Sequence, residues 1–183
     1  DDGDFQQQRF SDLVNNDLAN TIGNLLNRTS SMARKWFDDS VPPQTVESHI
    51  NHPLALKAQA TIATVMRCMP ELGFKAASES ILQLAIAANG HLNDTAPWSR
   101  MKQQGEEQSV ANDLYVVLES TRIVGLLLAP LLPDLSSRIL NQLNCSLDPE
   151  HWLDQLHWGG LTSGTELPKP EPVMARLELD DDL

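Results

Sequence analysis

The chain has 183 residues, of which 41% are hydrophobic, so it can bury one good core and we expect one domain. Its net charge of −12 and pI of about 4.6 exclude a protein that binds phosphates nonspecifically, because such binding needs clustered Lys and Arg. Any nucleic-acid function must therefore be local. No stretch approaches the roughly 20 apolar residues of a membrane span, and we expect no membrane partner.

The first residues and the cysteines bear on where such a chain occurs. The start, Asp1-Asp2-Gly3-Asp4, has neither a Met nor the pattern of a signal or transit peptide, and we expect a processed chain or an expressed fragment. Cys68 and Cys145 lie far apart, outside any CxxC spacing, and are predicted to be reduced thiols.

Apolar residues recur every three to four positions along most of the chain, which predicts amphipathic helices. Prolines or glycines separate the helices, and Pro70 can split the last turn of the second. The segment from Val110 to Leu128 is apolar nearly all round and is predicted to be the central, buried helix. The predicted helices cover roughly residues 6–38, 53–72, 74–92, 110–128 and 135–143.

Beyond Asp148 the composition changes. One short helical turn is expected around Trp152, and the glycines and prolines that follow forbid long regular structure. There is no convincing strand pair and no internal repeat. The predicted fold class is therefore all-α, a helical bundle of about five helices over residues 1–158. Residues 159–183 are predicted to be an irregular C-terminal tail that either packs back on the body or is displaced from it.

The sequence offers little for catalysis. The closest pair of histidines, His49 and His52, has no Cys or carboxylate beside it at metal-ligand spacing, so no metal site is predicted. The common phosphate cradles, metalloprotease helices and nucleophile elbows are also absent. We predict no catalytic residue and no cofactor in this chain, and an independent enzyme with an unrecognised site is the least favoured reading.

The informative feature is a polar face on the first predicted helix. Asn20, Asn24 and Arg28 stand at i, i+4 and i+8, and no acidic residue lies between Asn20 and Trp36. Asn and Arg side chains can bond the edges of unstacked bases. An Asn/Arg face is nevertheless most often only a solvated helix surface, and the residues alone leave both readings open.

A second such feature follows the third predicted helix. Trp98 comes directly after Pro97, and Arg100 and Lys102 follow within four residues. A Trp ring offers a stacking plane for a single-stranded base, and the two cations are possible supporting RNA contacts, as is Asn20. A Trp after a loop is more often a core residue, so this reading too stays open.

At these same residues the chain resembles methionyl-tRNA synthetases. Residues 17–29, DLANTIGNLLNRT, resemble the motif that opens the anticodon-binding domain of that family, with its Asn-Leu-x-x-Arg core. Residues 88–98, ANGHLNDTAPW, are similar to a segment between two helices of the same domain. The WGGL at 158–161, the GT at 164–165 and the KPEPV at 169–173 resemble the end of its core. The tRNA synthetases for leucine, isoleucine, valine and cysteine share the helical architecture, but the Ala96-Pro97-Trp98 match favours the methionine enzyme.

The resemblance implies a site and a partner. In the family the Asn and Arg of the first motif and the Trp of the second recognise the CAU anticodon, which implies Asn24, Arg28 and Trp98 here, with Pro97 shaping the loop. The implied partners are tRNA(Met) and a catalytic domain of the same protein. That domain's ATP and methionine sites and its zinc knuckle are missing from this sequence, so the fragment alone is expected to catalyse nothing.

The function, the compartment and the oligomeric state remain open from the sequence. The main alternative function is an RNA-free helical scaffold or dimerisation module descended from such a domain. It would gain if Trp98 were buried and far from Arg28, whereas the RNA reading requires Asn24, Arg28 and Trp98 to share one exposed patch. The compartment is expected to be a bacterial cytoplasm or the interior of a plastid or mitochondrion, and the oligomeric state is not predicted.

Overall fold

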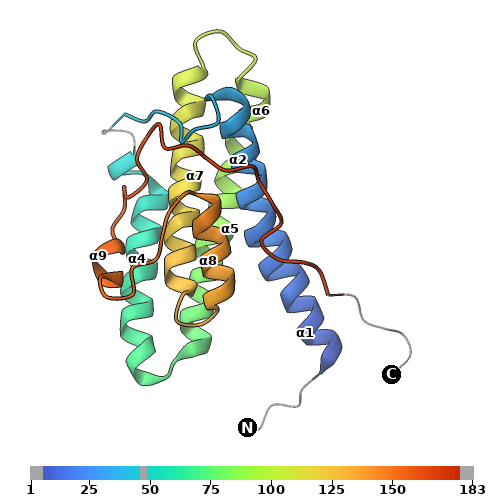
Figure 1. The fold of residues 1–183 in the computed structure, drawn as a ribbon, viewed down its shortest axis with the longest axis vertical. Helices are drawn as coiled ribbons and strands as arrows, with labels where there is room; N and C mark the ends of the chain where they lie inside the picture. The colour runs from blue at the N-terminus through green and yellow to red at the C-terminus, as the bar shows by residue number, and fades with distance from the viewer. Residues whose placement is uncertain (1–5, 46–48, 178–183) are drawn as a thin grey trace.

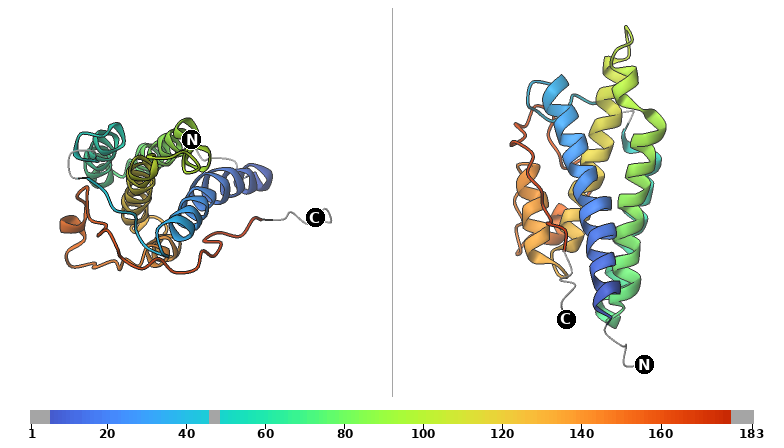
Figure 2. Two further views of the ribbon diagram at one scale, coloured as in Figure 1. Left: turned by 90° about the horizontal axis from the view of Figure 1, so that it is seen from above. Right: turned by 90° about the vertical axis from the view of Figure 1, so that its right-hand side faces the viewer.

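The computed structural model describes residues 6–45 and 49–177, and within them the chain forms a helical bundle (Figure 1). The bundle is elongated, with the first helical run along one side and the C-terminal segment laid across the outside (Figures 1 and 2). In the described residues the only β-type pairing is an isolated bridge between Ser40 and Glu166. The predicted all-α class is confirmed.

The long helices agree with the predicted ones to within a few residues at each end. Two single-turn helices, α6 and α9, and a 3-10 turn, η2, accompany them. The elements are α1 (Gln7–Leu13), η1 (Val14–Gly23), α2 (Asn24–Trp36), α4 (Pro53–Cys68), η2 (Met69–Glu71), α5 (Phe74–Thr95), α6 (Pro97–Arg100), α7 (Glu107–Leu128), α8 (Pro133–Gln142) and α9 (Trp152–Gln155).

The first helical run departs from the prediction in its middle. We expected one α-helix over residues 6–38, but Val14–Gly23 is π-helical, with α-helix before and after it. At the end of this stretch the Asn24 N–H donates to the Ala19 carbonyl, five residues earlier, and the Thr21 hydroxyl donates to the Asn16 carbonyl 2.9 Å away. Spacing of this kind is the π-helical repeat, in which i bonds to i+5. Apolar residues spaced three to four apart fit both an α-helix and a π-helical stretch, so the sequence pattern does not tell the two apart.

Helix α7 is the centre of the core, as its composition predicted. Every residue from Leu114 to Leu128 is buried, and α7 packs against α2, α4, α5 and α8. The approach of α8 is closest at Gly125, where an added Cβ would lie 2.9 Å from Ile139 Cγ2. Glycine is therefore favoured at this point, since any Cβ would force the two helices or the Ile139 side chain to shift.

The tail packs back on the body over all of its described part, residues 159–177. Leu161, Leu167 and Val173 are at most 3% exposed, so the tail contributes to the core. Its first turn is held by Glu119, a fully buried carboxylate on α7 that accepts hydrogen bonds from three successive backbone N–H groups. Of the two outcomes left open for the tail, the described residues show the packed one.

A buried ion pair organises the same place. Arg122 lies beside Glu119, with N–O distances of 2.6 and 3.0 Å, and also donates to the carbonyls of Gln155 and His157. An added Cβ on Gly160 would lie 2.7 Å from Arg122 Nη1, so only glycine fits there. The two glycines of the WGGL sequence thus bring the backbone against a buried charge pair.

The rest of the tail crosses to the first helical run, as Figure 1 shows. The Val41 N–H donates to the Thr165 carbonyl at 2.8 Å, and the Leu167 N–H donates to the Asp39 carbonyl at 2.7 Å. The amide side chain of Asn15 then bonds both the N–H and the carbonyl of Leu177, at 2.8 and 3.0 Å. These bonds fix the tail to the segment that follows α2 and to η1.

Candidate nucleic-acid interface

Arg28 on α2 and Trp98 on α6 meet at the surface. The Arg28 guanidinium carbon lies over the Trp98 ring, 5.3 Å from its centroid, which is the geometry of a cation–π contact. Trp98 is 38% exposed, and Arg28 is exposed as well. Asn93 at the end of α5 supports the pair, because its side-chain oxygen accepts from both terminal nitrogens of Arg28 at 3.4 and 3.5 Å.

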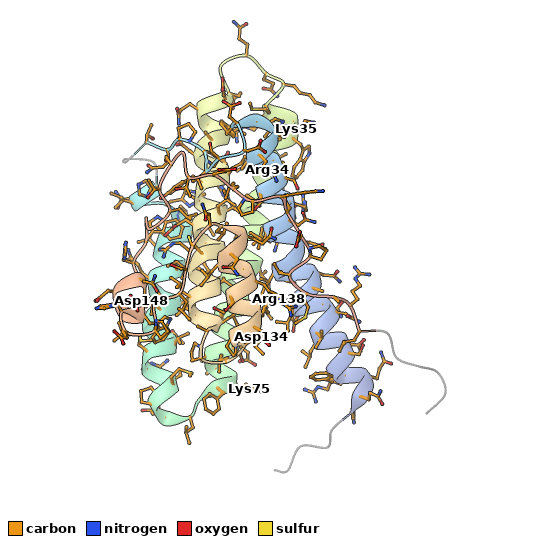
Figure 3. All side chains as sticks on the ribbon, in the orientation of Figure 1. Arg34, Lys35, Lys75, Asp134, Arg138 and Asp148 are labelled. Carbon is orange, nitrogen blue, oxygen red and sulfur yellow. The ribbon has the colours of Figure 1, made fainter. Side chains whose placement is uncertain are left out.

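Asn24 completes the patch. It is the first residue of α2, exposed, and four residues before Arg28, so the two side chains lie on one face of the helix. We call Asn24, Arg28 and Trp98 the recognition face. Arg34 and Lys35 follow in the last turn of α2 (Figure 3), although Arg34 is paired with Asp39 at 2.6 Å. The face combines an aromatic plane with amide and guanidinium donors.

The turn before Trp98 is strained. Ala96 has φ +41° and ψ +58°, a left-handed conformation that costs a non-glycine residue about 1–2 kcal/mol. It reverses the chain between α5 and α6. Pro97 follows as the first residue of α6, where its fixed φ suits a helix start, and it is buried. Pro97 therefore shapes this turn and does not itself reach the surface.

Arg100 does not join the recognition face. We expected it to be a possible RNA contact, but its guanidinium bonds Glu106 at 2.8 and 3.0 Å and Asp113 at 2.6 Å. The hydrogen bonds to Glu106 raise its pKa, and those to Asp113 add to the effect. Two carboxylates cancel the charge that a phosphate would need. The sequence could not reveal this, because Asp113 lies on another helix.

Asn20 and Lys102 have different surroundings. The Asn20 side-chain oxygen accepts from Arg176 of the tail at 2.6 Å, and its nitrogen donates to Asn16 at 3.4 Å. Asn20 is thus engaged with the tail. Lys102 is exposed in the turn after α6. Of the three supporting residues that we predicted, Lys102 keeps the most accessible position.

The histidines form a structural cluster. His52 caps the start of α4 by accepting from Leu54 N–H at 3.1 Å, and its ring packs edge-on against His91, with centroids 4.7 Å apart. Burial lowers the pKa of His52, and the nearby His91 lowers it further.

Across residues 6–45 and 49–177, no group of three or more His, Cys, Asp or Glu side chains is placed to hold a metal ion. In the same residues no helix is long and apolar enough to span a bilayer.

Two polar residues that matter here were not singled out by the sequence analysis. Asn93 bonds Arg28, and Asp113 anchors Arg100. Asn93 stands in the ANGHLNDTAPW segment, so its position near the site could have been suspected from the motif. Asp113 gave no signal, since an acidic residue at the start of an apolar helix usually faces solvent.

Comparison with known proteins agrees with this geometry. Residues 41–182 match the family described as the anticodon binding domain of methionyl tRNA ligase. A methionine–tRNA ligase of Thermosynechococcus vestitus is 41% identical over 97% of the chain, and the chloroplastic/mitochondrial one of Arabidopsis thaliana is 34% identical over 98%. The chain spans 35% and 30% of the lengths of these two relatives.

Solved structures agree as well. The apo form of Mycobacterium tuberculosis methionyl-tRNA synthetase superposes with a TM-score of 0.84 at 28% identity, over 96% of this chain and 36% of that one. Its complex with methionyl-adenylate gives 0.82 at the same identity. The family match, the full-chain relatives and the shared fold together show that this chain belongs to the anticodon-binding domain family of methionyl-tRNA ligases.

Proposed function

We propose that this chain binds the CAU anticodon of tRNA(Met) through the recognition face. The observation that carries the proposal is the cation–π contact between Arg28 and Trp98, which come from different helices and are both exposed. An exposed Trp beside a guanidinium and an amide can stack one unstacked base and bond the edges of its neighbours. We assign stacking to Trp98, and base-edge or phosphate bonds to Asn24 and Arg28.

The rest of the function belongs to a longer protein. We propose that the parent protein attaches methionine to tRNA with ATP, and that this part supplies anticodon recognition and no catalysis. The support is that the relatives, named as methionine–tRNA ligases, are about three times as long as the chain. Because those relatives are bacterial or chloroplastic/mitochondrial, we also propose a bacterial cytoplasm or an organelle interior as the compartment.

The alternative of an RNA-free scaffold loses support from the same geometry. That reading would have gained if Trp98 were buried and far from Arg28. Trp98 instead keeps 38% of its surface exposed, at 5.3 Å from the guanidinium. The net charge of −12 predicts that binding by the isolated chain is weak and confined to this face.

Binding of an anticodon stem-loop to single-residue variants tests the proposal. Trp98→Ala should remove roughly 1–3 kcal/mol of binding, about 5- to 150-fold, because one base loses its stacking plane. Arg28→Ala should weaken binding too, and Asn24→Ala should reduce discrimination at one anticodon position more than affinity. Competition with a stem-loop of scrambled anticodon measures that discrimination.

Trp152→Ala is the matched control. Trp152 is half-buried on α9, and its indole nitrogen donates to the Leu126 carbonyl at 2.9 Å, so its loss should lower stability without changing RNA affinity. If Trp98→Ala and Trp152→Ala bind the CAU stem-loop equally well, Trp98 is not a recognition residue and the scaffold reading gains.

A further inference from the structure

The helix that carries Trp98 needs outside support. Helix α6 has only four residues, Pro97–Arg100, and such a short helix does not hold its conformation in water alone. No side chain caps its start, and the preceding Ala96 is in a strained left-handed conformation. The position of the Trp98 ring therefore depends on what anchors α6 to the rest of the bundle.

Arg100, at the end of α6, supplies that anchor. Its Nε and Nη2 donate to Glu106 Oε2 at 3.0 and 2.8 Å, and its Nη1 donates to Asp113 Oδ2 at 2.6 Å. Nη2 also contacts Ser109 Oγ. Glu106 directly precedes α7, and Asp113 and Ser109 lie within it. One side chain thus ties the short helix to the most buried helix of the fold.

The anchor continues into a third helix. The other oxygen of Asp113, Oδ1, lies 3.1 Å from His91 Nε2 on α5. The Asp113 and His91 side chains are only 15% and 19% exposed, and Arg100 is 26% exposed. Ion pairs that are partly withdrawn from solvent are screened less than surface pairs, and charge-assisted hydrogen bonds are the stronger ones. The network therefore fixes α6 relative to both α5 and α7.

We propose that Arg100 is a positioning residue for RNA binding, which holds α6 through Glu106 and Asp113 so that Trp98 is presented to an unstacked base beside Arg28. This inference rests on the proposed function, because it explains how the recognition face is kept in place. Arg100 itself does not touch the RNA. Its guanidinium is turned into the bundle, toward carboxylates that oppose phosphate binding.

A positioning role for Arg100 and a direct contact of Arg100 with phosphate predict opposite changes in the RNA affinity of one variant. Asp113→Asn removes a negative charge near the face and weakens one bond of the anchor. If Arg100 contacted phosphate, this change would release the guanidinium and tighten RNA binding. If Arg100 positions α6, the same change lowers the fraction of molecules with Trp98 in place, and the apparent affinity falls in proportion to that fraction.

The experiment is a binding titration of the full 183-residue chain with a CAU anticodon stem-loop at several salt concentrations. Asp113→Asn and Arg100→Met are each expected to weaken binding by about tenfold if about a tenth of the molecules keep Trp98 in place. In a Trp98→Ala background neither change should weaken binding further, because the residue being positioned is gone. The salt dependence should not change, since no phosphate contact is lost.

Three comparisons keep the test decisive. Arg67→Met removes an equal charge from the exposed surface of α4 and should leave affinity unchanged. Arg100→Lys keeps the charge and one possible bond, and it should recover part of the lost affinity while melting at a temperature close to wild type. Circular dichroism of each variant ensures that only folded protein is compared.

The outcomes separate the two proposals. Unchanged binding by Asp113→Asn would overturn the positioning role. Tighter binding by that variant, or a salt slope that falls by about 0.7 in Arg100→Met, would overturn it and indicate a phosphate contact. If Trp98→Ala itself leaves binding unchanged, the proposed anticodon function fails instead. An equal loss from Arg100→Met with and without Trp98 would also refute positioning, because the effect would not pass through the Trp.

Discussion

Glu119→Gln should be among the most destabilising isosteric changes in this chain. Glu119 is fully buried and accepts five hydrogen bonds, two from Arg122 and three from the N–H groups of Gly159, Gly160 and Leu161. These bonds join the tail to the central helix. A glutamine has the same shape but replaces one acceptor oxygen by a donor, so packing is preserved while the bonds are lost.

The hydrogen bonds around Glu119 give the size of the expected loss of stability. In the less damaging orientation the new NH2 group stands at the Oε2 position, where it faces Arg122 Nε and Leu161 N–H, both at 3.0 Å. Two buried donors then lack an acceptor, at about 1–3 kcal/mol each, and the guanidinium loses its counter-charge. A loss of about 2–6 kcal/mol corresponds to a Tm lowered by about 4–24 °C for a domain of this size.

Urea unfolding monitored by circular dichroism measures the free energy of unfolding, and limited trypsin digestion reports the tail. Arg176 is exposed in the tail, and the peptide bond after it should be cut faster once the tail is released. Glu150→Gln, an exposed carboxylate just before α9, is the control and should be silent. If Glu119→Gln unfolds within about 0.5 kcal/mol of wild type, Glu119 does not hold the tail and the reasoning is wrong.

Other predictions concern charge, backbone and packing. Burial raises the pKa of Asp113, but its bonds to His91 and Arg100 outweigh burial and hold the pKa below its usual value, so its stabilisation is present above about pH 4 and is lost as pH falls through the lowered pKa. The Tm difference between wild type and Asp113→Asn should therefore be large at pH 6 and shrink below about pH 4. Leu72→Gly should raise the free energy of unfolding by about 0.5–1 kcal/mol in urea titrations, because Leu72 is 73% exposed and left-handed with φ +58°, whereas Leu72→Ala should give no gain. Gly125→Ala should cost about 1–3 kcal/mol by the same assay, since its Cβ would meet an α8 side chain at 2.9 Å, and a wild-type free energy of unfolding would show that the two helices separate easily.

Much of the fold could be read from local patterns. The helix boundaries follow from apolar spacing and from prolines such as Pro53 and Pro133, because a helix is closed by bonds between residues four apart. Burial of α7 followed from its composition. The relation of Asn24 to Arg28 was also local, since both lie on one helix one turn apart. The three ordered motifs pointed to the family for the same reason: each is a short contiguous stretch.

Tertiary structure decided what those residues do. Arg28 and Trp98 are 70 residues apart, and only the packing of α2, α5 and α6 brings the ring under the guanidinium. Arg100 looked as available as Arg28 in the sequence, yet Asp113 on α7 withdraws it from the surface. The tail is ordered by Glu119, the fully buried acid of α7. In each case the deciding interaction, whether a cation–π contact, a hydrogen bond or an ion pair, joins segments distant in the sequence, and a linear pattern does not contain the distance between them.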